Sequence, residues 1–85
     1  MGIDHPHVAT SLNNLALIYE HQGEYSKAEP LYRRSLAIWE KSFGPDHPQV
    51  AAGLRNYAML LRDTGRFEEA LELEARAAPI EAKQE

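Results

Sequence analysis

The stretch that decides the fold is DHPHVA at residues 4–9, because it recurs almost unchanged as DHPQVA at residues 46–51. Sliding the whole chain by this offset of 42 pairs residues 1–43 with residues 43–85 and gives 15 identical pairs, all in phase. Self-similarity at a fixed period of this size is the signature of a repeat architecture. The 85 residues are therefore two copies of one unit.

The first half of each unit predicts an amphipathic helix. In unit one, Pro6 suits the first turn, where its missing N–H costs nothing, with Asp4 or His5 as the N-cap. Gly23 supplies the left-handed stop expected at a helix C-terminus. The face predicted to be buried has apolar residues at a 4-3-1-3 spacing, typical of a helix with 3.6 residues per turn: Val8, Leu12, Leu15, Ala16 and Tyr19.

The second half of each unit predicts another helix. In unit one, SKAE at residues 26–29 has the pattern of a capping box, so Ser26 is expected to cap this helix. Pro30 then falls in the first turn or just beyond, and FGP at residues 43–45 ends the helix. The face predicted to be buried consists of Ala28, Leu31, Tyr32, Ser35, Leu36 and Trp39.

Unit two repeats this pattern, with a helix from Pro48 to about Thr64, a turn at Gly65 and a helix from about Phe67 to Ala82. Pro79 is expected to interrupt the final turns of that last helix. Gly53, inside the third helix, is predicted to allow close approach of a neighbouring helix. No stretch of four or more residues alternates in the manner of a strand. The fold class predicted is all-α, with four antiparallel helices.

The spacing of the leucine, alanine and tyrosine positions within each unit resembles that of the tetratricopeptide (TPR) repeat. In unit one the pattern is Leu12-x2-Leu15-Ala16-x2-Tyr19 followed by Ala28-x3-Tyr32; in unit two it is Leu54-x2-Tyr57-Ala58-x2-Leu61 followed by Ala70. The alanines are predicted to lie where two helices cross closely.

The period of 42 and the junction GPDHP at residues 44–48 look like the kinesin-light-chain type of this repeat, rather than the usual period of 34. The resemblance implies one domain over residues 1–85, with unit one at 4–42 and unit two at 46–83. It also implies that the units belong to an α-solenoid, a right-handed superhelix.

The two ends of the chain differ from this pattern. The last helix has Glu74 where the family has an aromatic residue, so residues 66–85 are interpreted as a C-terminal cap with a polar outer face. At the other end, residues 2–6 continue the phase of the junction, as though an earlier unit had been removed. We therefore expect an uncapped first helix that can pair with a second copy of the chain, since three or more repeats are normally needed for stability.

The resemblance also implies a concave groove, lined by the first helix of each unit, that holds an extended peptide. Amide side chains there bond both N–H and C=O of a peptide backbone, arginines hold a carboxylate bidentately, and apolar residues seat a side chain. The predicted peptide-binding residues are Asn13, Asn14, Leu17, Arg55, Asn56, Met59 and Arg62, on faces that also include Thr10, Glu20, His21, Ala52 and Asp63. An alternative remains open, in which the asparagines serve helix packing and the arginines only solubilise the surface.

Composition excludes several classes of partner. With 9 Lys+Arg against 13 Asp+Glu the formal net charge is −4, which argues against a nucleic-acid duplex or an anionic membrane surface. No apolar run approaches the roughly 18 residues of a membrane-spanning helix, and the N-terminus has no signal-peptide pattern. A cytoplasmic protein is therefore expected. The chain contains no cysteine, which removes disulfides and thiol catalysis.

Catalytic and metal motifs are not found either. None of the serines stands in a Gly-x-Ser-x-Gly context, and the spacing of His5 and His7 points their side chains to different sides of a helix. No His-Glu-x-x-His run accompanies them, so His5 and His47 are interpreted as junction residues that cap or pack against helices. The predicted function is a non-catalytic interaction module with a protein or peptide partner and no cofactor or metal. The alternative is a structural spacer or self-association segment of a longer solenoid.

Overall fold

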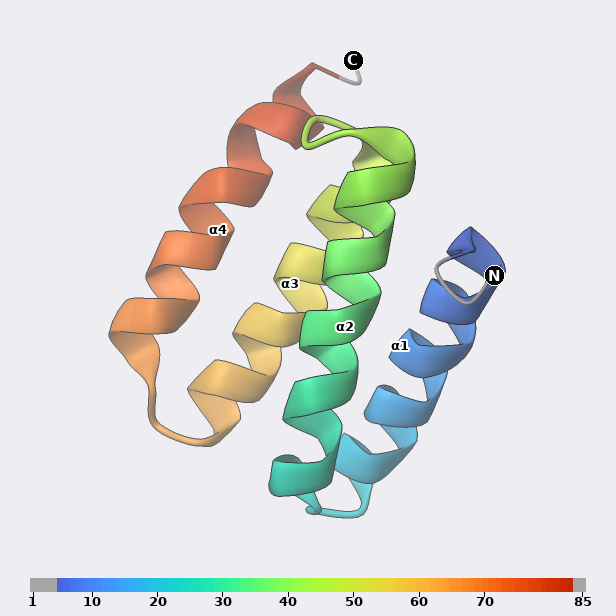
Figure 1. Cartoon of the computed structure of the whole chain (residues 1–85). Coiled ribbons are helices and arrows are strands. Elements are labelled where there is room, and N and C mark those ends of the chain that lie inside the picture. Colours follow the sequence, from blue (N-terminus) through green and yellow to red (C-terminus); the bar gives the residue numbers. More distant parts are fainter. Residues whose placement is uncertain (1–4, 84–85) are drawn as a thin grey trace.

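The computed structural model describes residues 5–83, which fold into four α-helices arranged as two hairpins (Figure 1). Consecutive helices run antiparallel, α2 packs on both α1 and α3, and α4 packs on α3. No strand occurs among residues 5–83, so the predicted all-α fold is confirmed. The helices are α1 (Pro6–His21), α2 (Tyr25–Phe43), α3 (Pro48–Asp63) and α4 (Phe67–Ala82).

Histidines begin the first helix of each unit. The Nδ1 atom of His5 accepts the backbone N–H of His7 at 3.1 Å, and Nδ1 of His47 accepts that of Gln49 at 3.0 Å. An N-cap side chain of this kind satisfies one of the backbone donors that a helix leaves unpaired. The prediction that His5 and His47 serve as caps is confirmed, whereas Asp4, the other candidate, lies outside the described residues.

The predicted capping box at Ser26 is wrong, because the N-cap of α2 is Glu24, two residues earlier, and its side chain makes no cap bond; the helix begins at Tyr25. The N–H of Glu24 bonds the carbonyl of Tyr19 at 2.8 Å, and the carbonyl of Glu24 accepts from Lys27 and Ala28 at 3.1 Å. Glu24 is thus held by the end of α1, and its carbonyl starts the next helix at once.

Both prolines of the second helices lie inside their helices. Pro30 is beyond the first turn of α2, and α4 continues past Pro79 to Ala82, so the predicted interruption is wrong. A proline inside a helix leaves the carbonyl four residues earlier without its partner. In both helices the proline and the residue four positions before it are exposed, so water can solvate that carbonyl.

Small residues allow the helices to approach closely. The alanines predicted at the crossings, Ala16 and Ala28 in unit one and Ala58 and Ala70 in unit two, are at most 1% exposed. The predicted role of Gly53 is also confirmed, because a Cβ atom there would lie 3.1 Å from ring carbons of Trp39 on α2. The core is formed by Ala9, Ala16, Ala28, Tyr32, Leu36, Ile38, Trp39, Val50, Ala51, Leu54, Tyr57, Ala58, Leu60, Leu61, Ala70, Ala77 and Ile80.

The buried face of α1 differs from the prediction. Of the five apolar residues expected there, only Ala16 is buried, while Val8, Leu12 and Tyr19 are half-buried and Leu15 is 40% exposed. The residues that α1 buries are Ala9, Asn13, Ala16 and Glu20. The physical reason is that α1 packs chiefly on α2, whereas α3 is packed between α2 and α4.

Candidate peptide-binding face

The predicted asparagines occupy three different environments on α1 and α3. Asn56 donates from Nδ2 to Oδ1 of Asn13 at 3.3 Å, which joins α3 to α1. Asn13 is buried and Asn56 is half-buried, so part of their hydrogen-bonding capacity serves the packing of the two helices. Asn14, which occupies the same repeat position as Asn56, is exposed. The two positions are therefore equivalent in sequence but not in environment.

The predicted apolar residues lie on the same two helices. Leu17 on α1 is half-buried, and Met59 on α3 is 58% exposed. An exposed, unbranched thioether side chain adapts its shape to a partner more readily than a branched one does. Helices α1 and α3 thus present an exposed amide and apolar side chains next to the Asn13–Asn56 hydrogen bond.

Both predicted arginines are paired with glutamates of α4. Arg55 donates from Nε to Oε2 of Glu81 at 2.9 Å and from Nη2 to Oε1, and Arg62 bonds Glu74 in the same way, with 2.8 Å at Nε. Bidentate pairs of this geometry are the strong form of the guanidinium–carboxylate interaction. Each guanidinium holds the pKa of its partner carboxyl below the usual range.

These pairs were not predicted from the sequence, although the repeat contains a signal for one of them. Shifted by 42 residues, Arg62 corresponds to Glu20 and Glu74 corresponds to Tyr32. In unit one these positions also interact, since the Tyr32 hydroxyl donates to Oε1 of Glu20 at 2.6 Å. The same two positions therefore form a polar contact in both units.

Glu20 was predicted on the groove face but is buried at the α1–α2 contact. Burial raises the pKa of Glu20, and the hydrogen bond from Tyr32 acts in the opposite direction. Burial, together with the bond to Glu20, also raises the pKa of Tyr32. Glu20 is thus committed to the contact between α1 and α2.

A second polar contact of α2, which is partly buried, was not predicted at all. Glu29 of α2 accepts from the Tyr57 hydroxyl at 2.7 Å and from Nη1 of Arg66 at 2.8 Å. The bond from Arg66 lowers the pKa of Glu29, and burial raises the pKa of Tyr57 to about 12. This contact fixes α2 against α3 and against the turn that precedes α4.

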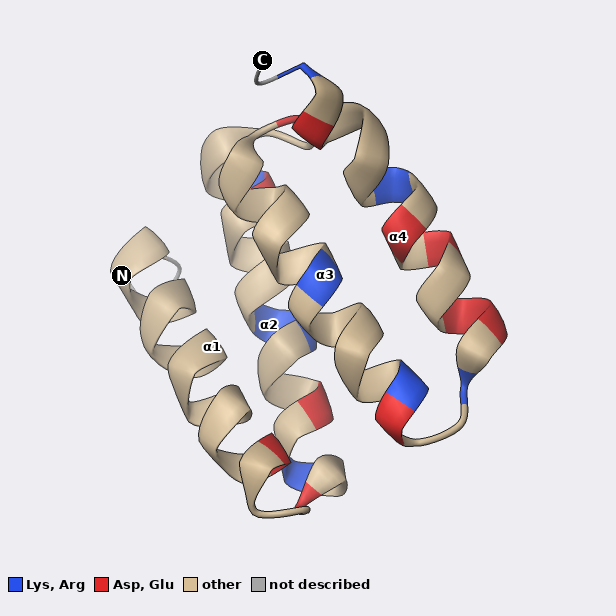
Figure 2. Ribbon diagram, turned by 180° about the vertical axis from the view of Figure 1, so that it is seen from behind, with Lys and Arg blue, Asp and Glu red and all other residues tan. Residues whose placement is uncertain are grey.

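Charged residues are distributed unevenly over the four helices. Glu20 is the only Lys, Arg, Asp or Glu of α1, whereas α4 carries five glutamates and one arginine along its length (Figure 2). No group of three metal-ligating side chains is assembled in the described part of the chain. The prediction that the side chains of His5 and His7 point to different sides is wrong: His5 is the N-cap, with extended backbone before the helix, and its ring stacks on that of His7 with centroids 4.7 Å apart.

Fold and surface together define a helical repeat module built from two helix-turn-helix units. The sequence profile of the tetratricopeptide repeat matches residues 2–81, so the chain belongs to the tetratricopeptide repeat family. Its period of 42 fits the kinesin-light-chain type. Repeats of this family generally mediate protein–protein interaction. None of the curated proteins compared with the chain matches it. Within residues 5–83, no helix is both long enough and apolar enough to cross a membrane.

Proposed function

We propose that this chain is a non-catalytic interaction module that holds an extended peptide, or an extended segment of a partner protein, along α1 and α3. The observation that carries the proposal is the combination of exposed Asn14 and Met59 with half-buried Leu17 on the first helices of the two units. Such a face offers both backbone hydrogen bonding and apolar contact to one strand of peptide.

Within this proposal the asparagines have different roles. Asn14 is exposed in unit one, and its side chain bonds the N–H and C=O of one peptide residue. The Asn13–Asn56 hydrogen bond keeps α1 and α3 in register, and Asn56 uses its remaining acceptor capacity for the ligand. Leu17 and Met59 take apolar side chains of the peptide. Two units make a short face, so we expect weak affinity, on the order of 10 µM.

The arginines bind an acidic group of the ligand while they stay paired with their glutamates. Each of Arg55 and Arg62 uses Nε and Nη2 for its glutamate and makes no further hydrogen bond from Nη1 within residues 5–83. A guanidinium has five N–H donors, so an acidic side chain of the ligand can bond Nη1. Because the glutamates already neutralise the arginines, the preference for acidic peptides is expected to be modest.

A second candidate function is a spacer within a longer solenoid, and one observation favours it. The two bidentate pairs, together with the Asn13–Asn56 bond, occupy many of the polar groups that a ligand would need. A spacer role predicts that the exposed groups on α1 and α3 select no peptide.

Selection from a random-peptide library against the full chain distinguishes the two functions. The interaction module enriches peptides with a shared pattern, and Asn14→Ala weakens their binding about five- to tenfold, as expected for one or two lost hydrogen bonds. Arg34→Ala, an exposed change on α2, is the matched control and leaves affinity unchanged. Absence of any enriched pattern, or equal loss with both variants, contradicts peptide binding along α1 and α3.

A further inference from the structure

The row of polar residues between α1 and α3 ends in two carboxyl groups. Because consecutive helices run antiparallel, α1 and α3 point in the same direction, and Asn56 of α3 bonds Asn13 of α1. Seven residues further along a helix, a side chain returns to nearly the same side, about 10 Å away. Glu20 stands seven residues after Asn13, and Asp63 stands seven residues after Asn56. The two carboxyl groups are therefore brought opposite each other, and Asp63 lies within hydrogen-bonding reach of Glu20.

Three features of this place oppose a negative charge on Glu20. The residue is 8% exposed, and burial raises the pKa of its carboxyl group. Asp63 supplies a second acidic group, which raises the pKa of Glu20 further. Glu20 stands one residue before the end of α1 and Asp63 is the last residue of α3, and the C-terminal end of a helix carries partial negative charge. The folded chain therefore favours the neutral form of Glu20.

Two neighbouring groups act in the opposite direction. Tyr32 of α2 donates its hydroxyl to Oε1 of Glu20 at 2.6 Å, and a charged ring of His21 on α1 favours the ionised carboxylate. Arg62, which precedes Asp63 on α3, is already engaged in a bidentate pair with α4. Because Tyr32 occupies Oε1, the other oxygen of Glu20 is left to carry a proton toward Asp63.

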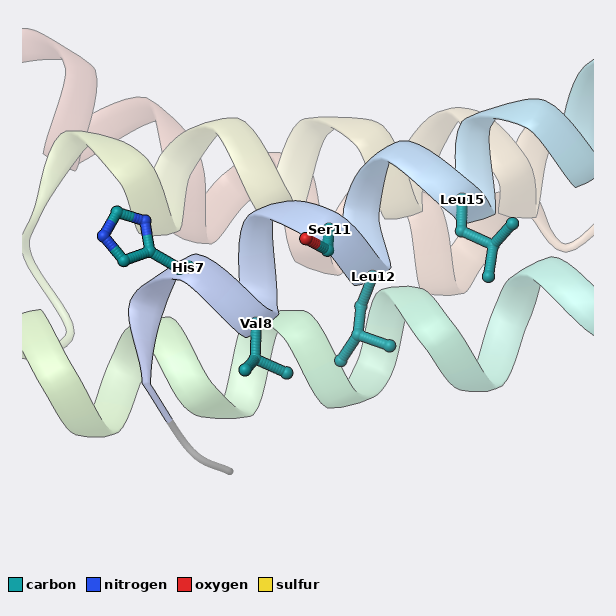
Figure 3. A pocket seen from close by; sticks show the side chains of 5 residues that line it. All are labelled: His7, Val8, Ser11, Leu12 and Leu15. Atoms are coloured by element: carbon teal, nitrogen blue, oxygen red, sulfur yellow. The ribbon is translucent and has the colours of Figure 1, made fainter. Parts of the chain in front are cut away.

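The opposite side of α1 carries no Lys, Arg, Asp or Glu. That side, here called the α1 flank, is formed by Val8, Ser11, Leu12, Leu15 and Ile18. Figure 3 shows the first four of these residues, together with His7, around an open hollow of about 300 Å³. His7 is titratable, but it stands 13 residues before Glu20, which is about 20 Å along the helix. The groups that face Glu20 are therefore Tyr32, His21 and Asp63.

We infer that Glu20 and Asp63 share one proton and so form a pH-sensitive contact between the C-terminal ends of α1 and α3. When Glu20 takes up a proton from the solvent, its O–H donates to the Asp63 carboxylate and joins the two helices. When Glu20 returns the proton to water, two carboxylates face each other and the contact is lost. Because the pKa of Glu20 is raised above the usual 4.5, the stabilisation is present below pH 4.5 and is lost as the pH rises through the raised pKa.

The contact borders the face proposed above for peptide binding. Along α1 and α3, Leu17 and Met59 lie between the Asn13–Asn56 bond and the carboxyl pair. Loss of the contact loosens this part of the face, so the affinity for a selected peptide is expected to fall about fivefold between pH 5 and pH 7.5. This consequence alone rests on the proposed function, and an affinity that stays constant with pH would contradict it.

Carbon-detected nuclear magnetic resonance of the ¹³C-labelled full chain tests the shared proton without any ligand. The Glu20 carboxyl carbon is expected to titrate above pH 4.5. The side-chain amide of Asn56 is expected to shift with the same midpoint, because it reports the spacing of α1 and α3. Asp63→Asn is expected to lower the midpoint of Glu20, since the second carboxylate is gone. Asp46→Asn, an exposed change at the α2–α3 junction, is the matched control and leaves that midpoint unchanged.

Thermal unfolding of Glu20→Gln gives a second readout. The amide keeps an acceptor for Tyr32 and offers an N–H to Asp63 at every pH, so it imitates the protonated carboxyl group. The variant is expected to melt about 4 °C above the parent chain at pH 7 and at the same temperature at pH 4. An Asn56 amide that does not follow Glu20, or a Glu20 midpoint unchanged by Asp63→Asn, overturns the inference. A library selection that yields no peptide contradicts the proposed function alone, because the titration needs no peptide.

Discussion

At the scale of single residues, the same repeat position has opposite requirements in the two units. Gly53 lies under Trp39 and Leu36 of α2, where even a Cβ atom makes tight contacts, whereas its counterpart Ser11 is exposed on the α1 flank. Glycine inside a helix costs up to about 1 kcal/mol relative to alanine, and this cost is accepted where close packing requires it. The environment of a repeat position therefore depends on which neighbour covers it.

This contrast predicts the effect of one substitution at two places. Gly53→Leu is expected to lower the free energy of unfolding by about 1–3 kcal/mol, because it overpacks the α2–α3 contact. Ser11→Leu is expected to change it by less than about 0.5 kcal/mol, because the new side chain meets open space. Urea denaturation followed by circular dichroism measures both values. Equal destabilisation by the two changes would show that the α1 flank is not open.

The lowered pKa of Glu29 predicts that the free energy of unfolding depends on pH. Its pKa is lowered from the usual 4.5, mainly by the hydrogen bond from Arg66, so its ionised form favours the folded chain. The stabilisation is present above pH 4.5 and is lost as the pH falls through the lowered pKa. Glu29→Gln is expected to reduce the free energy of unfolding by about 1–2 kcal/mol at pH 7, and by progressively less as the pH falls below 4.5. Thermal unfolding of both proteins between pH 3 and 7 measures this; a pH-independent difference would contradict it.

At the scale of helices, the caps decide where each unit begins. His47 accepts the N–H of Gln49 and stacks on Phe43, with ring centroids 4.3 Å apart, so it also fixes the junction between α2 and α3. His47→Ala is expected to cost about 1 kcal/mol, and His47→Asn less, because asparagine restores the cap but not the stack. Chemical denaturation of the three proteins tests the order. An asparagine variant as unstable as the alanine variant would show that the cap bond contributes nothing.

The helices themselves were predictable from the sequence because they depend on local signals. The 42-residue offset, the prolines at residues 6 and 48 and the left-handed glycines at 23 and 65 place all four helices within a few residues of their observed bounds. The start of α2 was misplaced, because the pattern at Ser26 suits a cap but the backbone of Glu24 is already held by Tyr19.

What depends on contacts between helices was harder to predict. The apolar spacing on α1 shows which residues share a face, but it does not show whether a neighbour covers that face, so Leu15 was wrongly expected to be buried. For the candidate peptide-binding face, the sequence predicted which residues lie on the first helix of each unit, α1 and α3. The pairing of Arg55 with Glu81 and of Asn13 with Asn56 joins residues 26 and 43 positions apart, which no local pattern encodes.

At the scale of the whole molecule, the helices differ in how many neighbouring helices pack against them. The α3 helix packs on both α2 and α4, and the pairs of Arg55 and Arg62 with glutamates add to its contact with α4. The α1 helix packs chiefly on α2 and leaves its flank exposed. In a repeat protein each unit draws its stability from its neighbours, so the helix with fewer contacts is the first to open.

Native-state hydrogen exchange is therefore expected to differ in rate between α1 and α3. Amides in the middle of α1 should exchange at least about tenfold faster than those in the middle of α3, since local opening of α1 exposes less buried surface. A single cooperative opening, with equal protection of the amides of α1 and α3, would contradict a lower local stability of α1.

The proposed peptide-binding face consists of the first helices of the two units. Nuclear magnetic resonance of the ¹⁵N-labelled chain, titrated with a peptide obtained by library selection, tests whether a peptide binds there. We expect the largest shift changes on the side-chain amides of Asn14 and Asn56 and on the backbone of α1 and α3 near Leu17 and Met59. Shift changes confined to α2 and α4, or to the α1 flank, would contradict it.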